Sequence, residues 1–447
     1  MNSTLDGKPG RRRSKGLRQF GQPKIAFFGH FDGSNFGNES TLQAMLHHLR
    51  QLVPDAHFSC ICTGPEATAA TYNITAVYSR AAVVKPWTLH SPLVRLARKL
   101  IVGVPSEAYH WLKTFKTLWG TDALIVPGTG LLTDAYTFFS WGPYDMFRWS
   151  VTAKLCGCKL LFVSVGAGPV YSRIGRFFVK TALSLADFRS YRDASTLQYL
   201  KGIGFRADHD PVYPDLAFSL PATAIPDGHD ANPGRPVVGL GLMEYAGKYS
   251  IERPTSTVQL AYLEHLAEFV KWLLAHEYDV RLLIGDRADT RVTQEFKSLL
   301  KRSAAYDEGR IIDAPVESAA DLMSQLAATD FVVATRFHNV LLSMILNKPV
   351  IAISFHHKCS SLMSQMGVAE YCQDINSLSA DTLIAQFSQL EQNADCVKRM
   401  IRERVGACQD ALNEQYNIIF SEICPDRQQV TQPVSESAHN PTNSVLL

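Results

Sequence analysis

Short apolar runs and amphipathic segments alternate along most of the chain. The apolar residues 24–29 end in a glycine, a loop rich in Gly, Asn and Ser follows, and residues 41–52 then show helical periodicity. Continuous apolar strands that alternate with helices in this way predict a parallel sheet covered on both faces. We expect further strands at 123–126, 159–165, 237–242, 280–284, 311–312, 331–334 and 350–354, and helices at 257–275, 290–300, 319–327 and 339–346.

One interruption in the alternation of strands and helices divides the chain. Residues 221–236 contain four prolines and two glycines among polar residues, which is typical of a linker. The full length of 447 residues also exceeds the size at which a single hydrophobic core usually stops growing. We therefore predict an α/β fold of two Rossmann-like lobes, residues 23–220 and 237–424, which face each other across a cleft at the carboxyl ends of their strands. The tails, 1–22 and 425–447, are expected to be disordered.

The composition excludes several classes of protein. A hydrophobic content of 46% and a mean hydropathy of −0.04 are typical of a globular protein and not of a membrane bundle. The net charge of +2 argues against nucleic acid as the main partner. No apolar segment follows the basic N-terminal tail as it would in a targeting signal, so we expect a cytoplasmic protein without a transmembrane segment. The tail itself is interpreted as a solvated extension, with peripheral contact to anionic lipid as the alternative.

The strongest candidate for chemistry is the pair Arg336 and His338. Both lie where an apolar strand ends and a predicted helix begins, an edge that faces the cleft. A helix N-terminus offers free N–H groups, Arg336 adds a permanent cation for a carboxylate or phosphate, and His338 can exchange a proton near neutral pH. Alternatively, Arg336 makes a salt bridge between the lobes and His338 caps the helix. We favour the functional interpretation because the two residues occur together.

A second cationic cluster follows the next strand, at His356, His357 and Lys358. Parallel neighbouring strands end at the same edge of a sheet, so this cluster is expected beside Arg336. Lys358 is the preferred phosphate ligand, whereas the two histidines fit a ligand, a base or a polar loop. No carboxylate or paired cysteines accompany them at a metal-ligand spacing, and we predict no metal site.

The first lobe contains three glycine turns at strand ends. None matches a nucleotide-binding glycine motif, so a plain tight turn is an alternative at each one. Three such turns on one edge suggest that something bulky approaches the backbone closely. The candidate contacts for an acceptor are Asn35, Gly37, Gly128, Gly130, Gly166 and Gly168.

One further arginine belongs to the predicted cleft. Arg192 follows a short apolar stretch, and Asp193 is placed to cap the next helix. Arg192 is then left to point into the cleft, although an ion pair with an aspartate is the common alternative.

Taken in order, these segments resemble the polysaccharide pyruvyl transferase family. The most specific parts are the Arg336-Phe337-His338 triplet, with Lys358 twenty positions after the histidine, and the Arg-Asp element at Arg192. Asn38, Thr129 and Glu244 differ from the residues usual in that family. The resemblance covers most of both lobes, at residues 29–46, 127–134, 164–169, 190–204, 210–215 and 335–367.

The resemblance implies a two-lobed, GT-B-like fold, with the acceptor on the N-terminal lobe and the donor on the C-terminal lobe. It also implies transfer of the pyruvyl group of phosphoenolpyruvate onto two sugar hydroxyls as a ketal, without a cofactor. The donor carries a carboxylate and a phosphate, for which Arg336, Lys358 and Arg192 are the expected cations. His338 is the expected proton donor, and the partner is a glycan or a lipid-linked saccharide.

Two other functions remain open at this stage. A nucleotide-sugar glycosyltransferase would use the same architecture, with a diphosphate at the same helix N-terminus, and fold alone does not separate the two. A non-catalytic protein that binds sugar phosphates would bind without turnover.

Overall fold

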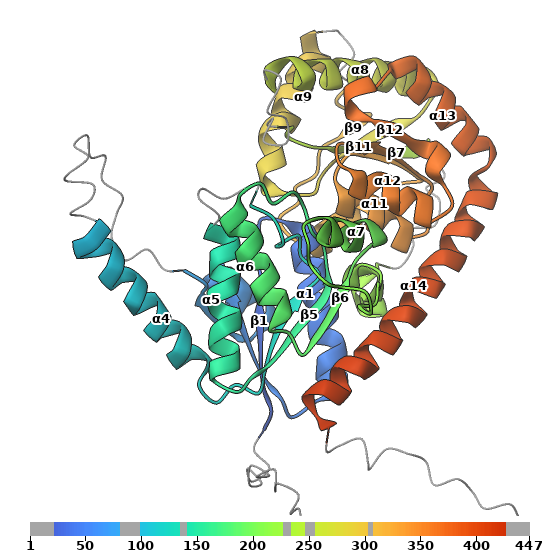
Figure 1. The fold of residues 1–447 in the computed structure, drawn as a ribbon. Helices are drawn as coiled ribbons and strands as arrows, with labels where there is room; N and C mark the ends of the chain where they lie inside the picture. Colours follow the sequence, from blue (N-terminus) through green and yellow to red (C-terminus); the bar gives the residue numbers. More distant parts are fainter. Residues whose placement is uncertain are drawn as a thin grey trace, which may run out of the picture.

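The computed structural model describes residues 22–80, 99–134, 141–226, 234–245, 255–302 and 307–425. It contains two six-stranded parallel sheets with helices packed around each (Figure 1). The strand order is β3-β2-β1-β4-β5-β6 in the first sheet and β12-β11-β10-β7-β8-β9 in the second. This confirms the predicted fold class. The strands are β1 (Lys24–Phe28), β2 (His57–Cys62), β3 (Thr75–Tyr78), β4 (Ala123–Pro127), β5 (Lys159–Val165), β6 (Phe188–Tyr191), β7 (Val237–Leu242), β8 (Asp279–Ile284), β9 (Ile311–Ile312), β10 (Phe331–Ala334), β11 (Val350–Ser354) and β12 (Cys372–Asp374).

The helices follow the strands as the alternating pattern predicts. Residues 227–233 of the predicted linker, and both predicted tails except Gln22 and Pro425, lie outside the described residues. The α-helices are α1 (Phe36–Leu52), α2 (Pro65–Tyr72), α4 (Val104–Leu118), α5 (Trp141–Leu155), α6 (Arg173–Ser184), α7 (Ala194–Gly202), α8 (Thr255–Ala275), α9 (Thr290–Arg302), α10 (Ala319–Ala327), α11 (Phe337–Ile345), α12 (His357–Gln365), α13 (Ala380–Gln392) and α14 (Ala394–Ile423). A π-helical turn (Lys99–Gly103) precedes α4, and short 3₁₀ turns include η3 (Leu216–Ser219) and η5 (Arg287–Asp289).

The central strands are buried on both faces. Every residue of β4, β7 and β11 is buried, as expected for strands that have parallel neighbours and helices on either side. Their apolar runs end at the same edge of each sheet, and the residues that follow them in the chain form the loops at that edge. The two edges face each other, and this arrangement brings the candidate site residues together.

The glycine loop before α1 joins the two lobes directly. The N–H of Phe36 donates to the carbonyl of Gly285 (3.2 Å), and the N–H of Arg287 donates to the carbonyl of Ser34 (2.9 Å). The amide of Asn35 donates to Asp286 of the second lobe (3.0 Å) and its oxygen caps α1 by accepting from the N–H of Asn38. Asn35 is therefore engaged in a contact between the lobes, in addition to the loop position predicted for it.

The last helix, α14, runs along one side of both lobes (Figure 1). Although it belongs to the segment predicted as the second lobe, its C-terminal half packs on the first. The Gln415 carboxamide accepts hydrogen bonds from Ser164 (3.0 Å) and Ser190 (3.2 Å), and the Tyr416 hydroxyl bonds to Ser219 (2.8 Å). Among the described residues, no helix has the length and apolar character needed to cross a bilayer.

Candidate active site

Arg192 lies between the lobes, directly after β6. Asp193 caps α7 by accepting from the N–H of Thr196 (2.6 Å), which confirms the predicted capping role. The Arg192 side chain is only 6% exposed; its Nη1 donates to Asp215 (3.0 Å), and its guanidinium carbon lies 4.7 Å from the centre of the Phe337 ring of the other lobe. Its Nε and Nη2 are buried and make no hydrogen bond within the described part of the chain. Such unpaired buried donors are costly and point to a ligand that completes them.

Lys358 reaches the same space from the second lobe. It lies in the first turn of α12, where the His356 ring caps the helix by accepting from the Lys358 N–H (3.4 Å). Its Nζ is 3.3 Å from the position that a Cβ would take on Gly130 of the first lobe. Burial, with the charge of Arg192, lowers the pKa of Lys358 to about 7 although Asp193 acts in the opposite direction. An added anion would therefore stabilise the protonated form.

His338 completes the group from the first turn of α11. Its Nε2 is 3.8 Å from the Asp215 carboxylate and, in the ranges that the structure describes, has no hydrogen-bond partner. The other side of the ring lies against Gly37, where a Cβ would be 1.8 Å from Nδ1. Burial lowers the pKa of His338 to about 4; Asp215 raises it, but the neighbouring cations lower it further. The imidazole of the ligand-free protein is neutral at pH 7.

Arg336 is engaged differently from either prediction. Its Nε and Nη2 donate to the two carboxylate oxygens of Asp289 (2.9 and 2.6 Å). Asp289 is fully buried and also accepts from the backbone N–H of Glu244 (2.9 Å). Burial raises the pKa of Asp289, while Arg336 acts to lower it. The salt bridge thus exists within the second lobe and not between the lobes, and it fixes Arg336 just before α11.

A pocket of about 330 Å³ lies between the lobes at these cations. Arg192, Asp215 and Tyr213 line it from the first lobe, and Phe337 and Lys358 line it from the second. A pocket of this composition suits a small anion with an apolar portion, because the cations Arg192 and Lys358 and the aromatic ring of Phe337 line it together. Neither Arg336 nor His338 is among the residues that line it, although His338 contacts Asp215, which does.

The glycine turns of the first lobe give room to the protein's own cations. A Cβ on Gly166 would lie 2.8 Å from Arg192 Nη2, and those on Gly130 and Gly37 would meet Lys358 and His338. Gly128 and Gly168 instead pack closely against other side chains of the first lobe, including Thr41 and Thr133. The predicted close approach is therefore found at all of these turns, but the approaching groups are side chains. The role of these turns in acceptor binding stays a prediction.

The comparisons with known proteins agree with this geometry. The family model described as "Polysaccharide pyruvyl transferase" matches residues 35–357, which is well over half of the chain. The chain belongs to the polysaccharide pyruvyl transferase family.

Individual relatives of the transferase are distant. The amylovoran biosynthesis protein AmsJ of Erwinia amylovora is 28% identical over 101 residues, which cover 23% of the transferase and only 22% of AmsJ. Among solved structures, a UDP-GlcNAc 2-epimerase from Neisseria meningitidis bound to UDP-GlcNAc has a TM-score of 0.54 at 12% identity, over 91% of the transferase and 100% of that chain. A glycosyltransferase from Rickettsia africae has the same TM-score, identity and coverage. These likenesses show the GT-B-like fold.

Two carboxylates of the transferase site were missed by sequence reasoning. Asp215 caps the η3 turn and contacts both Arg192 and His338. Asp289 ends the η5 turn and pairs with Arg336. An aspartate that follows a proline and precedes an apolar turn was the available signal for Asp215. Nothing in the local sequence distinguishes Asp289 from the nearby acidic residues of its turn.

The remaining candidates have structural roles. Burial and neighbouring cations lower the pKa of His356 to about 3, which suits its capping role as a neutral acceptor. Asn38 donates to the His30 carbonyl (3.0 Å), and Glu244 pairs with Arg291. Thr129 has a buried hydroxyl without a hydrogen-bond partner in the described ranges. No group of three or more metal-ligating His, Cys, Asp or Glu side chains occurs among the described residues.

Proposed function

We propose that the transferase moves the pyruvyl group of phosphoenolpyruvate onto two hydroxyls of a sugar, in a polysaccharide or its precursor, as a ketal. The observation that supports this most is that two buried nitrogens of Arg192, Nε and Nη2, make no hydrogen bond in the described ranges, although Nε lies 3.7 Å from the Asp193 carboxylate. They lie beside the Lys358 ammonium, at a pocket shared by both lobes. A carboxylate and a phosphate on one small molecule match two such cations. Membership of the pyruvyl transferase family supports the same donor.

Each cation is assigned to one part of the donor. Arg192 presents two N–H groups of a planar guanidinium, which suits the carboxylate, and Lys358 presents a point charge, which suits the phosphate. The Phe337 ring lies against Arg192 and provides an apolar wall for the methylene group. Arg336 is bonded to Asp289 and does not line the pocket, so it is assigned to positioning the start of α11.

The reaction requires one proton at carbon and the loss of phosphate. Protonation of the methylene carbon produces an oxocarbenium-like centre at C2, which one sugar hydroxyl attacks as it releases its proton. Departure of phosphate allows the second hydroxyl to attack, the proton of this hydroxyl passes to the leaving phosphate, and the products are the ketal and inorganic phosphate. His338 is assigned as the proton donor: the negative charges of a bound donor would raise the pKa of its ring, which is low in the ligand-free protein.

A thermal-shift titration with phosphoenolpyruvate tests the donor. At about one hundred times its Kd, a ligand of the folded state adds roughly 2.7 kcal/mol of stability, which a clear rise in Tm would reveal. Inorganic phosphate release with a lipid-linked saccharide then tests turnover. Release of nucleoside diphosphate from a sugar nucleotide, with no response to phosphoenolpyruvate, would contradict the proposal in favour of a glycosyltransferase.

The affinity for the donor is expected to fall as the pH rises above neutral. The folded protein lowers the pKa of Lys358 to about 7, so the free ammonium loses its proton above that pH, and binding the anionic donor must restore it. Donor Kd should therefore be nearly constant below about pH 7 and rise by up to about tenfold per pH unit above it. Calorimetric titrations from about pH 6 to about pH 9 measure this slope.

The variant Lys358→Arg is the matched control, because a guanidinium stays charged across this range. It should bind the donor more weakly at neutral pH but with a Kd that no longer depends on pH. A wild-type Kd that stays constant through this range would show that Lys358 does not contact the donor.

A further inference from the structure

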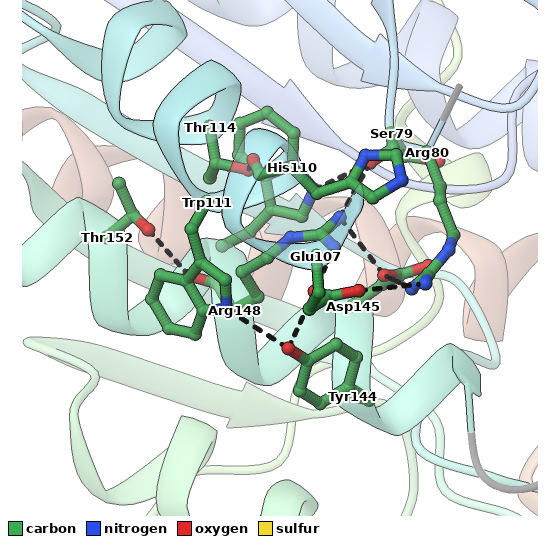
Figure 2. Close-up of polar contacts among 11 residues, drawn as sticks. Ser79, Arg80, Glu107, His110, Trp111, Thr114, Tyr144, Asp145, Arg148 and Thr152 are labelled. Atoms are coloured by element: carbon green, nitrogen blue, oxygen red, sulfur yellow. Dashed lines mark hydrogen bonds and ion pairs between the residues drawn. The ribbon is translucent and has the colours of Figure 1, made fainter. Parts of the chain in front are cut away.

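Helix α4 directs its one acidic side chain, that of Glu107, into the protein. The Glu107 carboxylate accepts hydrogen bonds from the Tyr144 hydroxyl (2.7 Å) and from Arg148 (3.1 Å), an arginine that is fully buried on α5. Arg80 pairs with both Glu107 (3.0 Å) and Asp145 (2.9 Å), and Asp145 pairs in turn with Arg148. Figure 2 shows this network between α4, α5 and the segment at Ser79. The acidic residue of α4 therefore lies on the inner side of the helix.

The outer side of the same helix is apolar. Val104 is 61% exposed, Leu112 71% and Trp119, which ends the helix, 70%, and the ring of Phe115 packs on that of Trp119 (5.2 Å between centroids). These positions are separated by three, four, seven or eight residues, which places them along one face. A helix at the surface of a globular protein normally has the opposite arrangement, with apolar residues inward. In Figure 1, α4 lies at the outer side of the first lobe, beyond α5.

The exposed apolar surface continues onto α6. Ile174 and Phe177 of that helix are 59% and 56% exposed. Ring contacts connect the helices, since Trp111 of α4 lies 6.5 Å from Phe147 of α5, and Phe147 lies 6.2 Å from Phe177. We define the outer face by the exposed apolar residues of the two helices: Val104, Leu112, Phe115, Trp119, Ile174 and Phe177.

Positive charge accompanies this outer face. Lys113 and Lys116 lie on α4, and Arg173 and Arg176 lie at the start of α6. The sole carboxylate in the sequences of the two helices is Glu107, which the network holds inward. The sequence of residues 81–106, which leads into α4, contains four Lys or Arg and no Asp or Glu.

A groove of about 930 Å³ runs between α4 and the edge of the first sheet. Leu112 and Trp119 of the outer face line it, together with Lys113 and Lys116, and Lys24 and His57 line its opposite wall. Lys24 begins β1, so the N-terminal segment joins the described structure beside this groove. The sequence of residues 1–21 contains six Lys or Arg and one Asp. Three described basic residues, Lys24, Lys113 and Lys116, therefore line the same groove as the apolar Leu112 and Trp119.

We propose that the outer face docks on the surface of a membrane that contains anionic lipids. Leu, Phe and Trp side chains flanked by Lys and Arg are the composition with which helices enter the boundary between headgroups and acyl chains. A second copy of the chain fits less well, because a twofold contact would place the same lysines and arginines against one another. The membrane is the occupant that complements both the apolar side chains and the charge.

The position of α6 connects this face to the site. Helix α6 follows the Gly166–Gly168 turn, beside Arg192, and Asp134 accepts from the backbone N–H groups of Tyr171 (2.8 Å) and Ser172 (3.1 Å) at its start. Docking would hold this flank of the first lobe against the bilayer. Resting on the proposed function, we infer that the acceptor is a saccharide carried on a membrane lipid.

Co-sedimentation of the full chain with vesicles tests the docking. We expect binding to vesicles with roughly a third phosphatidylglycerol and much weaker binding to pure phosphatidylcholine. Leu112→Ser should lower the partition coefficient by about tenfold, because the side chain no longer enters the apolar layer. Lys116→Gln should lower it by about fivefold, the contribution of one basic residue near an anionic surface. Leu260→Ser, at a 51% exposed leucine on α8 of the second lobe, is the matched control and should change nothing.

Two further measurements separate the outcomes. Phosphate release with a soluble oligosaccharide acceptor should be unchanged in Leu112→Ser, so a failure of docking is distinguishable from a failure of the proposed function. Absence of binding to anionic vesicles, or binding that Leu112→Ser does not weaken, would overturn the proposal. So would a dimer in light scattering that Leu112→Ser converts to a monomer, because that result assigns the face to a second copy.

Discussion

Replacing His338 by alanine is expected to lower kcat by about a hundred- to ten-thousandfold, the usual contribution of a positioned acid. Donor affinity should change little, because the contacts assigned to the carboxylate and phosphate come from Arg192 and Lys358. Single-turnover phosphate release measures the first effect, and calorimetric titration with phosphoenolpyruvate measures the second.

The control for this substitution is His265→Ala, at a histidine whose side chain is 38% exposed on α8. It should retain wild-type kcat and Kd. If His338→Ala raised the donor Kd and left kcat unchanged, the assignment as a proton donor would be wrong, since that pattern indicates loss of uniform binding.

The substitution Gly37→Ala should reduce kcat/KM by about a hundredfold, although it adds a single methyl group. The new Cβ would lie 1.8 Å from His338 Nδ1, so the ring must turn or the lobes must separate. Displacement of a catalytic group by about 1 Å is enough for a loss of this size. The protein should still fold, because alanine in place of glycine favours the helical backbone of α1. Steady-state kinetics and thermal unfolding together measure the two effects.

Gly406→Ala is the matched control, because no atom lies within 4 Å of the Cβ position at that helical glycine on α14. It should leave kcat/KM unchanged. Wild-type kinetics in Gly37→Ala would mean that the close contact between Gly37 and His338 is not needed for turnover.

The fold was readable from the sequence because buried parallel strands leave apolar runs with clear ends. Strands at 159–165, 237–242, 331–334 and 350–354 were predicted with the bounds that the structure has. The placement of Lys358 and Arg192 near each other also followed, since both come directly after strands whose carboxyl ends face the cleft. Whether a residue follows the end of a strand depends on the local sequence, so the hydrophobic pattern of that sequence predicts it.

The sequence did not predict which carboxylate pairs with each arginine of the site. Arg336 bonds to Asp289, which is 47 positions away, and Arg192 bonds to Asp215, which is 23 positions away. Which carboxylate reaches a given arginine depends on how η5 and η3 turn after their strands and on the docking of the lobes. The glycines at 37, 130 and 166 show the same limit, because the side chains that need their space come from other segments.

The path of α14 restricts how the transferase can open. The chain passes from the first lobe to the second between Leu220 and Val237, and α14 then returns to contact Ser164, Ser190 and Ser219 of the first lobe. Two bodies connected at two places cannot twist freely about a single tether. The lobes can undergo hinge rotation chiefly about the axis that passes through both connections. Entry of a donor between Arg192 and Lys358 would then require a rotation of the lobes about this one axis, with α14 as one of the two connections that define it.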